Sequence, residues 1–292
     1  MALAVPNFSE GRDPDAIAAI AEAFGRAEIL DRHTDVVHNR SVLTLSAGPG
    51  ELVGALVAGA EACIERIDIS AHGGEHPCVG ALDVCPVVFV DERGRSLARE
   101  LALEAALAIG DLGVPVFLYG ELASQPRRAE RAYFRRGGSA ALAERMRSGE
   151  LAADFGPAAP HPSAGATLVT ARPPLAAFNV ELDTVDTGVA IEIARRLRES
   201  GGGLGGVRAI GVDLGDRAQV STNIHDPVAV PLGMVIEEVR ALAATRGARP
   251  VAAEVVGLVP QAALRELPED VPLRDFDPAR QVLENRVEGA SS

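Results

Sequence analysis

Apolar and polar positions follow two different periods along the first half of the chain, and these periods predict strands and helices in turn. Short apolar runs predict strands, whereas apolar residues that recur every three to four positions predict amphipathic helices. The helix expected at 13–26 would begin after an Asp cap, with Pro14 in its first turn. The predicted order is β-α-β-β-α-β, with strands at 2–6, 29–31, 42–45 and 84–90 and helices at 13–26 and 51–67.

The second half repeats this order, which is that of the split βαβ or ferredoxin-like module. Its strands are expected at 177–182, 207–212, 218–222 and 251–259, and its helices at 189–198 and 231–245. We therefore predict an α/β fold (an α+β sandwich) of two ferredoxin-like βαββαβ subdomains. A ligand cleft is expected between them, because ligands often bind where domains meet. Extra helices and a strand at 115–119 lie between the halves, and the predicted divisions are 1–175, 176–280 and a flexible tail at 281–292.

The overall charge and the cysteine count narrow the classes of function. The 292 residues include 28 Lys and Arg and 41 Asp and Glu, which gives a net charge of −13. This acidic balance argues against a nucleic-acid partner, and an anionic ligand would need a local basic patch. Three cysteines without metal or redox spacing indicate a reducing compartment. We found no signal-peptide pattern and no apolar run of membrane-spanning length, so we expect a cytoplasmic protein with no membrane partner.

The stretch AHGGEHPCVGALDVCP at 71–86 carries the densest polar chemistry of the chain. His72-x-x-Glu75-His76 matches the H-x-x-E-H pattern of inverted zinc peptidases, which needs both histidines on one helical face. Two glycines and Pro77 disfavour a helix there, so we predict no metal site. A loop histidine acting as a general base and a solvated surface loop are both compatible with the spacing. Cys78 could act as a thiolate nucleophile, but a small loop residue is the better interpretation.

Two further groups of polar residues lie near predicted strand ends. Asp31 and Asp35, followed by Asn39 and Arg40, form either a site at a strand end or a charged hairpin connection. In the second half, residues 219, 221 and 223 alternate along a predicted strand and would share one face. They would form a ligand-reading edge or a capped strand end. A G-x-G-x-x-G pattern at 201–206 follows a helix and precedes a strand, so it does not predict a dinucleotide site.

Eight short motifs occur in order from about residue 4 to residue 265: VPNFSEGRD (5–13), GEHPCVGALDVCP (74–86), VPVFLYGE (114–121), DFGP (154–157), GAT (165–167), AFNVEL (177–182), QVSTN (219–223) and VGLVP (256–260). Together they resemble the glutamate formimidoyltransferase family, the formiminotransferase part of formiminotransferase-cyclodeaminase. The resemblance implies two ferredoxin-like subdomains with a folate cleft and a homodimer. It implies a folate-dependent transfer of the formimino group from N-formimino-L-glutamate to N5 of the co-substrate tetrahydrofolate, in histidine degradation and one-carbon metabolism. Only the transferase part is expected.

The resemblance also implies which residues act. The catalytic histidine of the GEHP motif is His76, which would take the proton from N5 and pass it to the departing glutamate nitrogen. Its carboxylate partner would come from the loop after the second strand, where Asp31 and Asp35 are rival candidates and His33 is the other residue that the aligned position could hold. Arg172 could pair with a substrate carboxylate. The full set of predicted substrate or folate contacts is Asn7, Ser9, Asn39, Arg40, Glu75, Gly80, Arg172, Asn179, Gln219, Ser221 and Asn223.

Several positions depart from the family pattern. Cys78 replaces a basic residue after GEHP, Pro173 replaces a lysine, and Ala71 and Gly73 stand where basic residues flank the first histidine. Folates are polyanions, so the loss of these cations weakens the expectation of a folate tail. The alternative is a homologue with an altered substrate, which transfers a formyl group or binds a small ligand other than folate. A zinc metallohydrolase is the least favoured interpretation.

Overall fold

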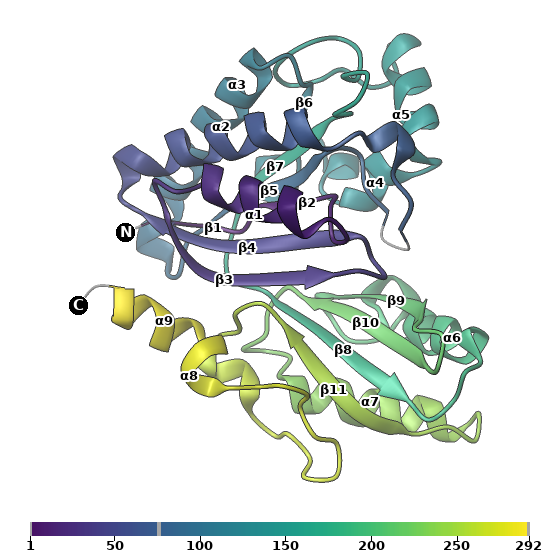
Figure 1. Ribbon diagram of the computed structural model, residues 1–292. Coiled ribbons are helices and arrows are strands. Elements are labelled where there is room, and N and C mark those ends of the chain that lie inside the picture. The colour runs from purple at the N-terminus through teal and green to yellow at the C-terminus, as the bar shows by residue number, and fades with distance from the viewer. Residues whose placement is uncertain (1, 75–76, 291–292) are drawn as a thin grey trace. The chain divides into compact units, whose positions relative to one another are not determined.

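The computed structural model describes residues 2–74 and 77–290, and the chain folds into two compact units (Figure 1). The first unit spans Met1–Pro173 and the second spans Pro174–Ser292. Each unit has its own β-sheet with helices packed against it. The mixed α/β class predicted from the sequence is therefore confirmed.

The sheet of the first unit has seven strands in the order β1-β4-β2-β5-β7-β6, with β3 on the outer side of β4. Strands β1 and β2 are two consecutive pieces that each pair with β4 and with β5. The pairings of β7 with β5 and with β6 are parallel, and the other pairings in this sheet are antiparallel. The strands are β1 (Ala2–Ala4), β2 (Asn7–Phe8), β3 (Glu28–Asp35), β4 (Arg40–Ala47), β5 (Leu82–Val88), β6 (Val116–Leu118) and β7 (Thr167–Arg172).

Pro86 of β5 shapes the break between β1 and β2. The Val5 N–H donates to the Pro86 carbonyl at 2.9 Å, but Pro86 has no N–H to return the bond. The side-chain amide of Asn7 donates to the Val5 carbonyl at 2.8 Å instead. Asn7, predicted as a substrate contact, therefore satisfies a carbonyl that the ladder leaves open.

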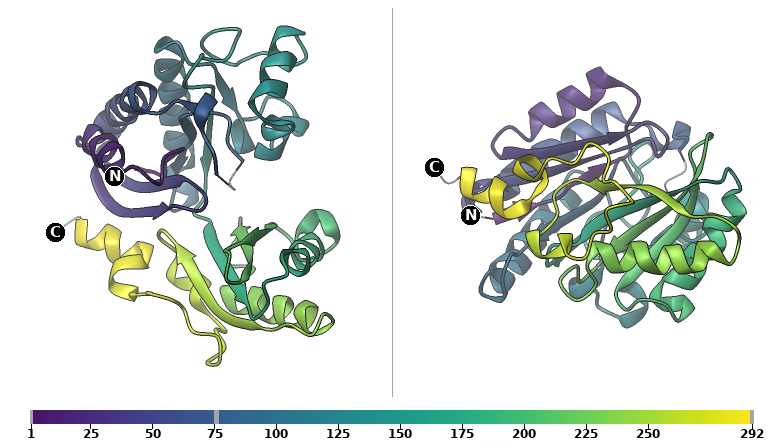
Figure 2. Two further views of the ribbon diagram at one scale, coloured as in Figure 1. Left: turned by 45° about the vertical axis from the view of Figure 1, so that its right-hand side comes forward. Right: turned by 90° about the horizontal axis from the view of Figure 1, so that it is seen from below.

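Helices cover both faces of this sheet. On one face lie α1 (Pro14–Ala23), α2 (Pro49–Arg66) and α3 (Arg95–Asp111), with α1 and α2 side by side (Figures 1 and 2). Cys85 and Val169 belong to the core beneath them. Their chain neighbours Val84 and Leu168 face the other way, into a second core with residues of α4 (Arg131–Arg135) and α5 (Gly138–Arg147).

The second unit follows the predicted order β-α-β-β-α-β. Its four strands are antiparallel in the order β11-β8-β10-β9, and both helices pack on the same face (Figure 2). The elements are β8 (Ala176–Leu182), α6 (Thr187–Leu197), β9 (Val207–Asp213), β10 (Ala218–Ile224), α7 (Leu232–Ala244) and β11 (Pro250–Val256). The sheet of the first unit has two further strands, β6 and β7, which the order β-α-β-β-α-β does not include.

Two short helices follow the second sheet. They are α8 (Pro278–Gln281) and α9 (Leu283–Ala290), so the segment that we expected to be a flexible tail contains a helix. The Val259 N–H donates to the Gln281 carbonyl at 2.9 Å, and the Leu283 N–H donates to the Val259 carbonyl at 3.0 Å. These bonds tie the two helices to the strand end of their own unit. Within the described residues, no helix has both the length and the apolar character that a membrane crossing requires.

Candidate functional site

Three of the predicted site residues on β3 and β4 lie on the face of the first sheet that is opposite α1, α2 and α3. Leu43 and Leu45 of β4 belong to the core beneath these helices, so alternation turns Arg40 to the opposite face. Asp35 pairs with Arg40 across the strands, and Asp31 pairs with Thr44. Because directly paired residues share a face, both carboxylates lie on the same side as Arg40.

Asp35 is held by His38 in the turn between β3 and β4. The His38 ring Nδ1 lies 2.5 Å from one carboxylate oxygen, and the His38 backbone N–H donates to the other at 2.9 Å. Burial alone would raise the pKa of Asp35, but these hydrogen bonds and the nearby charges of His38 and His33 lower it to about 2. Asp35 is therefore an ionised carboxylate, and both of its oxygens are hydrogen-bonded to His38.

Asn39 joins three separate segments of the chain. Its side-chain oxygen accepts from the Gly11 N–H at 2.9 Å. Its side-chain nitrogen lies 3.2 Å from His72 Nδ1 and donates to the Gly73 carbonyl at 3.2 Å. Both amide hydrogens of this predicted substrate contact are thus engaged with the protein itself.

The loop that carries the GEHP motif is packed closely at both of its described ends. A Cβ at Gly74 would lie 2.5 Å from the His38 carbonyl oxygen, and one at Gly80 would lie 2.0 Å from the Ala166 carbonyl oxygen. The Ser9 hydroxyl also donates to the Gly80 carbonyl at 2.7 Å. Ser9 and Gly80, which we predicted as substrate or folate contacts, therefore help to fix the loop through contacts within the protein. The predicted residues Glu75 and His76 lie outside the described residues.

His72 does not have the setting that an inverted zinc-peptidase motif requires. It follows a single 3₁₀ turn, Ile69–Ala71, and its own backbone is extended (φ −67°, ψ 131°) rather than helical. Its Nδ1 is engaged with Asn39. Among the described residues, no group of three or more His, Cys, Asp or Glu side chains is placed to hold a metal ion.

Asp83 is a buried charge at this site that our sequence analysis missed. It is 1% exposed in β5 and accepts from the Val79 N–H at 2.7 Å, just after the GEHP motif. Its other oxygen forms an ion pair with Arg135 of α4. An acidic residue inside the otherwise apolar run LDVCPVV is the signal that could have identified it.

Arg131 lies within electrostatic reach of three other arginines of the first unit, Arg40, Arg135 and Arg172, and we call these four residues the arginine cluster. Burial, together with the charges of Arg131 and Arg135, lowers the pKa of Arg40 to about 10, although Asp83 and Asp35 oppose this shift. Burial also lowers the pKa of Arg172 to about 10, opposed by Tyr119 and reinforced by Arg131. The cluster is a local basic patch in a chain of net charge −13.

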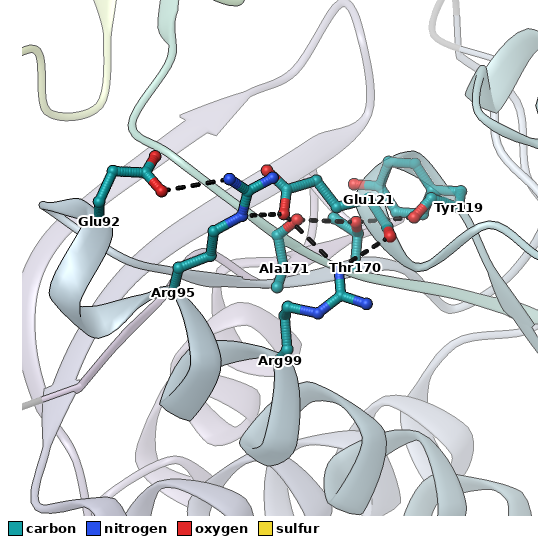
Figure 3. Close-up of polar contacts among 7 residues, drawn as sticks. All are labelled: Glu92, Arg95, Arg99, Tyr119, Glu121, Thr170 and Ala171. Atoms are coloured by element: carbon teal, nitrogen blue, oxygen red, sulfur yellow. Dashed lines mark hydrogen bonds and ion pairs between the residues drawn. The ribbon is translucent and has the colours of Figure 1, made fainter.

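A network of polar contacts fixes the segment after β6 (Figure 3). The Tyr119 carbonyl accepts from the Thr170 hydroxyl at 2.7 Å. Arg95 donates to the Glu121 carboxylate at 3.0 Å, and Arg99 donates to the Glu121 carbonyl at 3.0 Å. Burial lowers the pKa of Arg131, and the nearby Tyr119 opposes this shift. The contacts therefore position a tyrosine near two of the four arginines.

The predicted residues of the second unit share one face of its sheet, as alternation predicted. Phe178 and Val180 point into the core under α6 and α7, so Asn179 faces the other way, and it pairs directly with Ser221. The Asn179 amide donates to Glu254 at 3.2 Å. Gln219 is 3% exposed, and its side-chain oxygen has no hydrogen-bond partner among the described residues. Asn223 follows on the same face, opposite Ala177.

Comparison with known proteins places both units in one family. Residues 1–172 match the formiminotransferase domain, N-terminal subdomain, and residues 177–269 match the formiminotransferase domain. The chain is 38% identical over 292 residues to glutamate formimidoyltransferase of Streptococcus pyogenes serotype M1, covering 98% of both chains. It is 37% identical to glutamate formimidoyltransferase of Thermoplasma acidophilum, covering 99% of this chain and 97% of that one. The formimidoyltransferase-cyclodeaminase of Sus scrofa is 40% identical over 276 residues, which are 89% of this chain and 50% of the relative. These matches confirm the resemblance found in the sequence.

Proposed function

The chain belongs to the formiminotransferase family, and from this premise we propose that it is a glutamate formimidoyltransferase. The proposed reaction moves the formimino group of N-formimino-L-glutamate to N5 of tetrahydrofolate. The observation that carries this proposal is the similarity to two proteins of that name along nearly the whole of each chain. We include the homodimer in the proposal on the strength of the same resemblance.

The chemistry requires one proton to be accepted and one to be donated, and a single group can do both in turn. A bond forms between N5 and the formimino carbon, and the bond from that carbon to the glutamate nitrogen breaks. The proton on N5 must leave, and the glutamate nitrogen must gain one before it departs. We assign both transfers to His76, because an imidazole exchanges its proton near neutral pH. Its place in the GEHP motif supports this assignment, as do the close contacts of Gly74 and Gly80 on either side of it.

The two carboxylates have supporting roles in this proposal. Asp35 would supply a fixed negative charge near the loop, because it is ionised and ordered by His38. Asp31, on the same sheet face, is the rival candidate for the partner of the base. A carboxylate beside a catalytic imidazole stabilises the protonated form that arises during transfer.

The arginine cluster is the part of the site that suits the substrates. Formiminoglutamate carries two carboxylates, and folate carries the carboxylates of its glutamate tail. Guanidinium groups bind carboxylates through paired hydrogen bonds, and partial burial strengthens such pairs. Arg40 and Arg172 were expected here, whereas Arg131 comes from α4 and offsets part of the positive charge missing at Cys78 and Pro173. Arg135 of the same helix is paired with Asp83. We therefore favour the folate substrate over the altered-substrate alternative.

The test is an assay of the purified protein with formiminoglutamate and tetrahydrofolate, in which 5-formiminotetrahydrofolate is followed. We expect product from the wild type and a fall of about 10²–10⁴-fold in kcat for His76→Asn, the usual contribution of general acid–base catalysis. His225→Asn is the matched control, because this histidine is exposed in the turn after β10 and we expect it to keep its activity. A folded wild type that gives no product would show that the family likeness extends to the fold and not to the reaction.

A further inference from the structure

Asn39 lies where three segments distant in sequence meet. Its side chain bonds to Gly11 in the loop after β2 and to His72 and Gly73 in the loop before the GEHP motif, and Asn39 itself belongs to the β3–β4 turn. Its φ of 47° is in the left-handed region, which asparagine tolerates better than most residues. The contact of Gly74 with the His38 carbonyl brings the same loop against the same turn.

The hydrogen-bond partners of Asn39 determine the protonation state of His72. A backbone N–H can only donate, so the Asn39 atom that faces the Gly11 N–H must be the carbonyl oxygen. The amide nitrogen then faces His72 and Gly73, and it can only donate. The Gly73 carbonyl accepts one hydrogen at 3.2 Å, and His72 Nδ1 must accept the other at 3.2 Å. An Nδ1 that accepts carries no proton, so His72 is neutral with its proton on Nε2.

From these contacts we propose that Asn39 and neutral His72 form a clamp that holds the GEHP loop against the β3–β4 turn, which makes Asn39 a positioning residue for the transfer reaction. The clamp rests only on described contacts, whereas its effect on the reaction rests on the proposed function. The assignment differs from our sequence prediction, in which Asn39 contacted the substrate directly.

The surroundings of His72 favour its neutral form. Burial lowers the pKa of His72 below its ordinary value, and the charge of Arg12 acts in the same direction. Glu10, Asp83 and a hydrogen bond to the Ser9 backbone raise the pKa but do not outweigh burial. Protonation of Nδ1 would set two donors against each other across the bond to Asn39, so acidification should open the clamp.

The variant Asn39→Asp reverses this requirement. A carboxylate still accepts from the Gly11 N–H and tolerates the left-handed backbone. It cannot donate to the Gly73 carbonyl or to a neutral Nδ1, but it accepts from a protonated imidazole. We therefore expect the pKa of His72 to rise by about one unit or more in this variant, because an opposite charge now lies within hydrogen-bond distance.

Imidazole ¹⁵N NMR measures this directly and without substrate. In the wild type we expect His72 to carry its neutral proton on Nε2 and to titrate below pH 6.5, its ordinary value. His161 is an internal reference, because its Nδ1 accepts from the Ala164 N–H at 3.0 Å and should not respond to the change at Asn39. Asn285→Asp in α9 makes the same chemical change in the second unit and should leave His72 unaltered. An Nδ1–H tautomer in the wild type, or an unmoved His72 titration in Asn39→Asp, would overturn the clamp.

Kinetics then test the positioning role. We expect Asn39→Asp to lower kcat by about 10- to 100-fold, the usual effect of a small misplacement near the chemistry, with KM changed less than about threefold. His72→Asn keeps an acceptor oxygen near the position of Nδ1 and does not titrate, so its kcat should lack the part of the decrease at low pH that protonation of His72 causes in the wild type. If the NMR results hold but kcat of Asn39→Asp is unchanged, Asn39 is not a positioning residue. If the wild type is inactive, the NMR results still decide whether the clamp exists.

Discussion

Asp35 shows how a single partly buried carboxylate can remain strongly acidic. Its side chain is 23% exposed, yet its pKa is lowered from 3.8 to about 2 because two hydrogen bonds from His38 outweigh the effect of burial. The folded state therefore releases this proton more readily than the unfolded state does. Between about pH 2 and pH 4 the unfolded chain binds more protons, so the free energy of unfolding rises with pH in that window.

We expect Asp35→Asn to lose this contribution. At pH 7 its free energy of unfolding should be lower than that of the wild type by about 2 kcal/mol, the equivalent of the pKa shift. Below about pH 2 the deficit should vanish, since Asp35 is then protonated in both states. Urea unfolding followed by circular dichroism at several pH values measures the difference.

Asp111→Asn, at the exposed end of α3, is the control and should change stability by less than about 0.5 kcal/mol. If Asp35→Asn and the wild type lose stability equally on acidification from pH 4 to pH 2, the paired carboxylate at Asp35 does not stabilise the fold.

Single residues also show which contacts of the candidate site could not be predicted from the sequence. Strand ends drew attention to Asp31, Asp35 and Arg40 as one candidate group, because such signals are local, and the register of β3 and β4 then places the three residues on one face. They could not show that the amide of Asn39 is used by the protein itself, since its partners lie at Gly11 and Gly73. The pairing of Asp83 with Arg135 was missed for the same reason: the two residues are remote in sequence, and Arg135 lies in none of the eight motifs.

At the scale of a loop, two adjacent glycines provide a matched pair of mutations. A Cβ at Gly74 would lie 2.5 Å from the His38 carbonyl oxygen, whereas a Cβ at Gly73 meets nothing within 4 Å. We expect Gly74→Ala to lower the free energy of unfolding by about 1–3 kcal/mol, the usual cost of overpacking. Gly73→Ala should be within about 0.5 kcal/mol of the wild type.

Chemical denaturation of the two variants tests this, and the transferase assay adds a second comparison. Gly74→Ala should also lose activity, because the GEHP loop must move away from the β3–β4 turn. Equal stability of the two variants would mean that the loop does not depend on this close approach.

The elements themselves were predicted unevenly. Hydrophobic periodicity located the helices α1, α2, α6 and α7 to within a few residues, since each has one continuous apolar face. Strand β7 was missed: TLVTAR stands just before the expected domain boundary, and the sequence analysis assigned no element to it. Its partners are β5 and β6, and no local pattern indicates a parallel pairing across so long a stretch of chain.

At the scale of the whole molecule, each unit has hydrophobic core clusters of its own among the described residues. The clusters of the first unit draw on residues 2–171, and that of the second draws on residues 176–271. Each unit therefore has the means to exclude water from its own interior. The net charge of the whole chain is a poor guide to a local site, because the total of −13 conceals the arginine cluster.

We expect a fragment of residues 174–292 to fold by itself. It should show one cooperative urea transition, followed by far-ultraviolet circular dichroism, with a slope of about 1–3 kcal/mol/M as for other small domains. The same fragment with Val220→Asp, which places a charge in its core, is the unfolded control. A fragment that loses its signal gradually, like that control, would show that the second unit needs the first in order to fold.

The position of β1 and β2 has a consequence for the order of events during synthesis. These strands occupy the middle of the first sheet, where Leu3 pairs with Ser46 on one side and with Val88 on the other. The ribosome therefore makes the central strand before either of its neighbours. Until β5 emerges, an apolar segment that ends inside the sheet has an unpaired edge, which is the kind of surface that chaperones bind. The nascent chain thus carries this open edge while Asp35 and Asn39 have already been made, and β5 closes the edge before Arg131 and Arg172 of the arginine cluster follow.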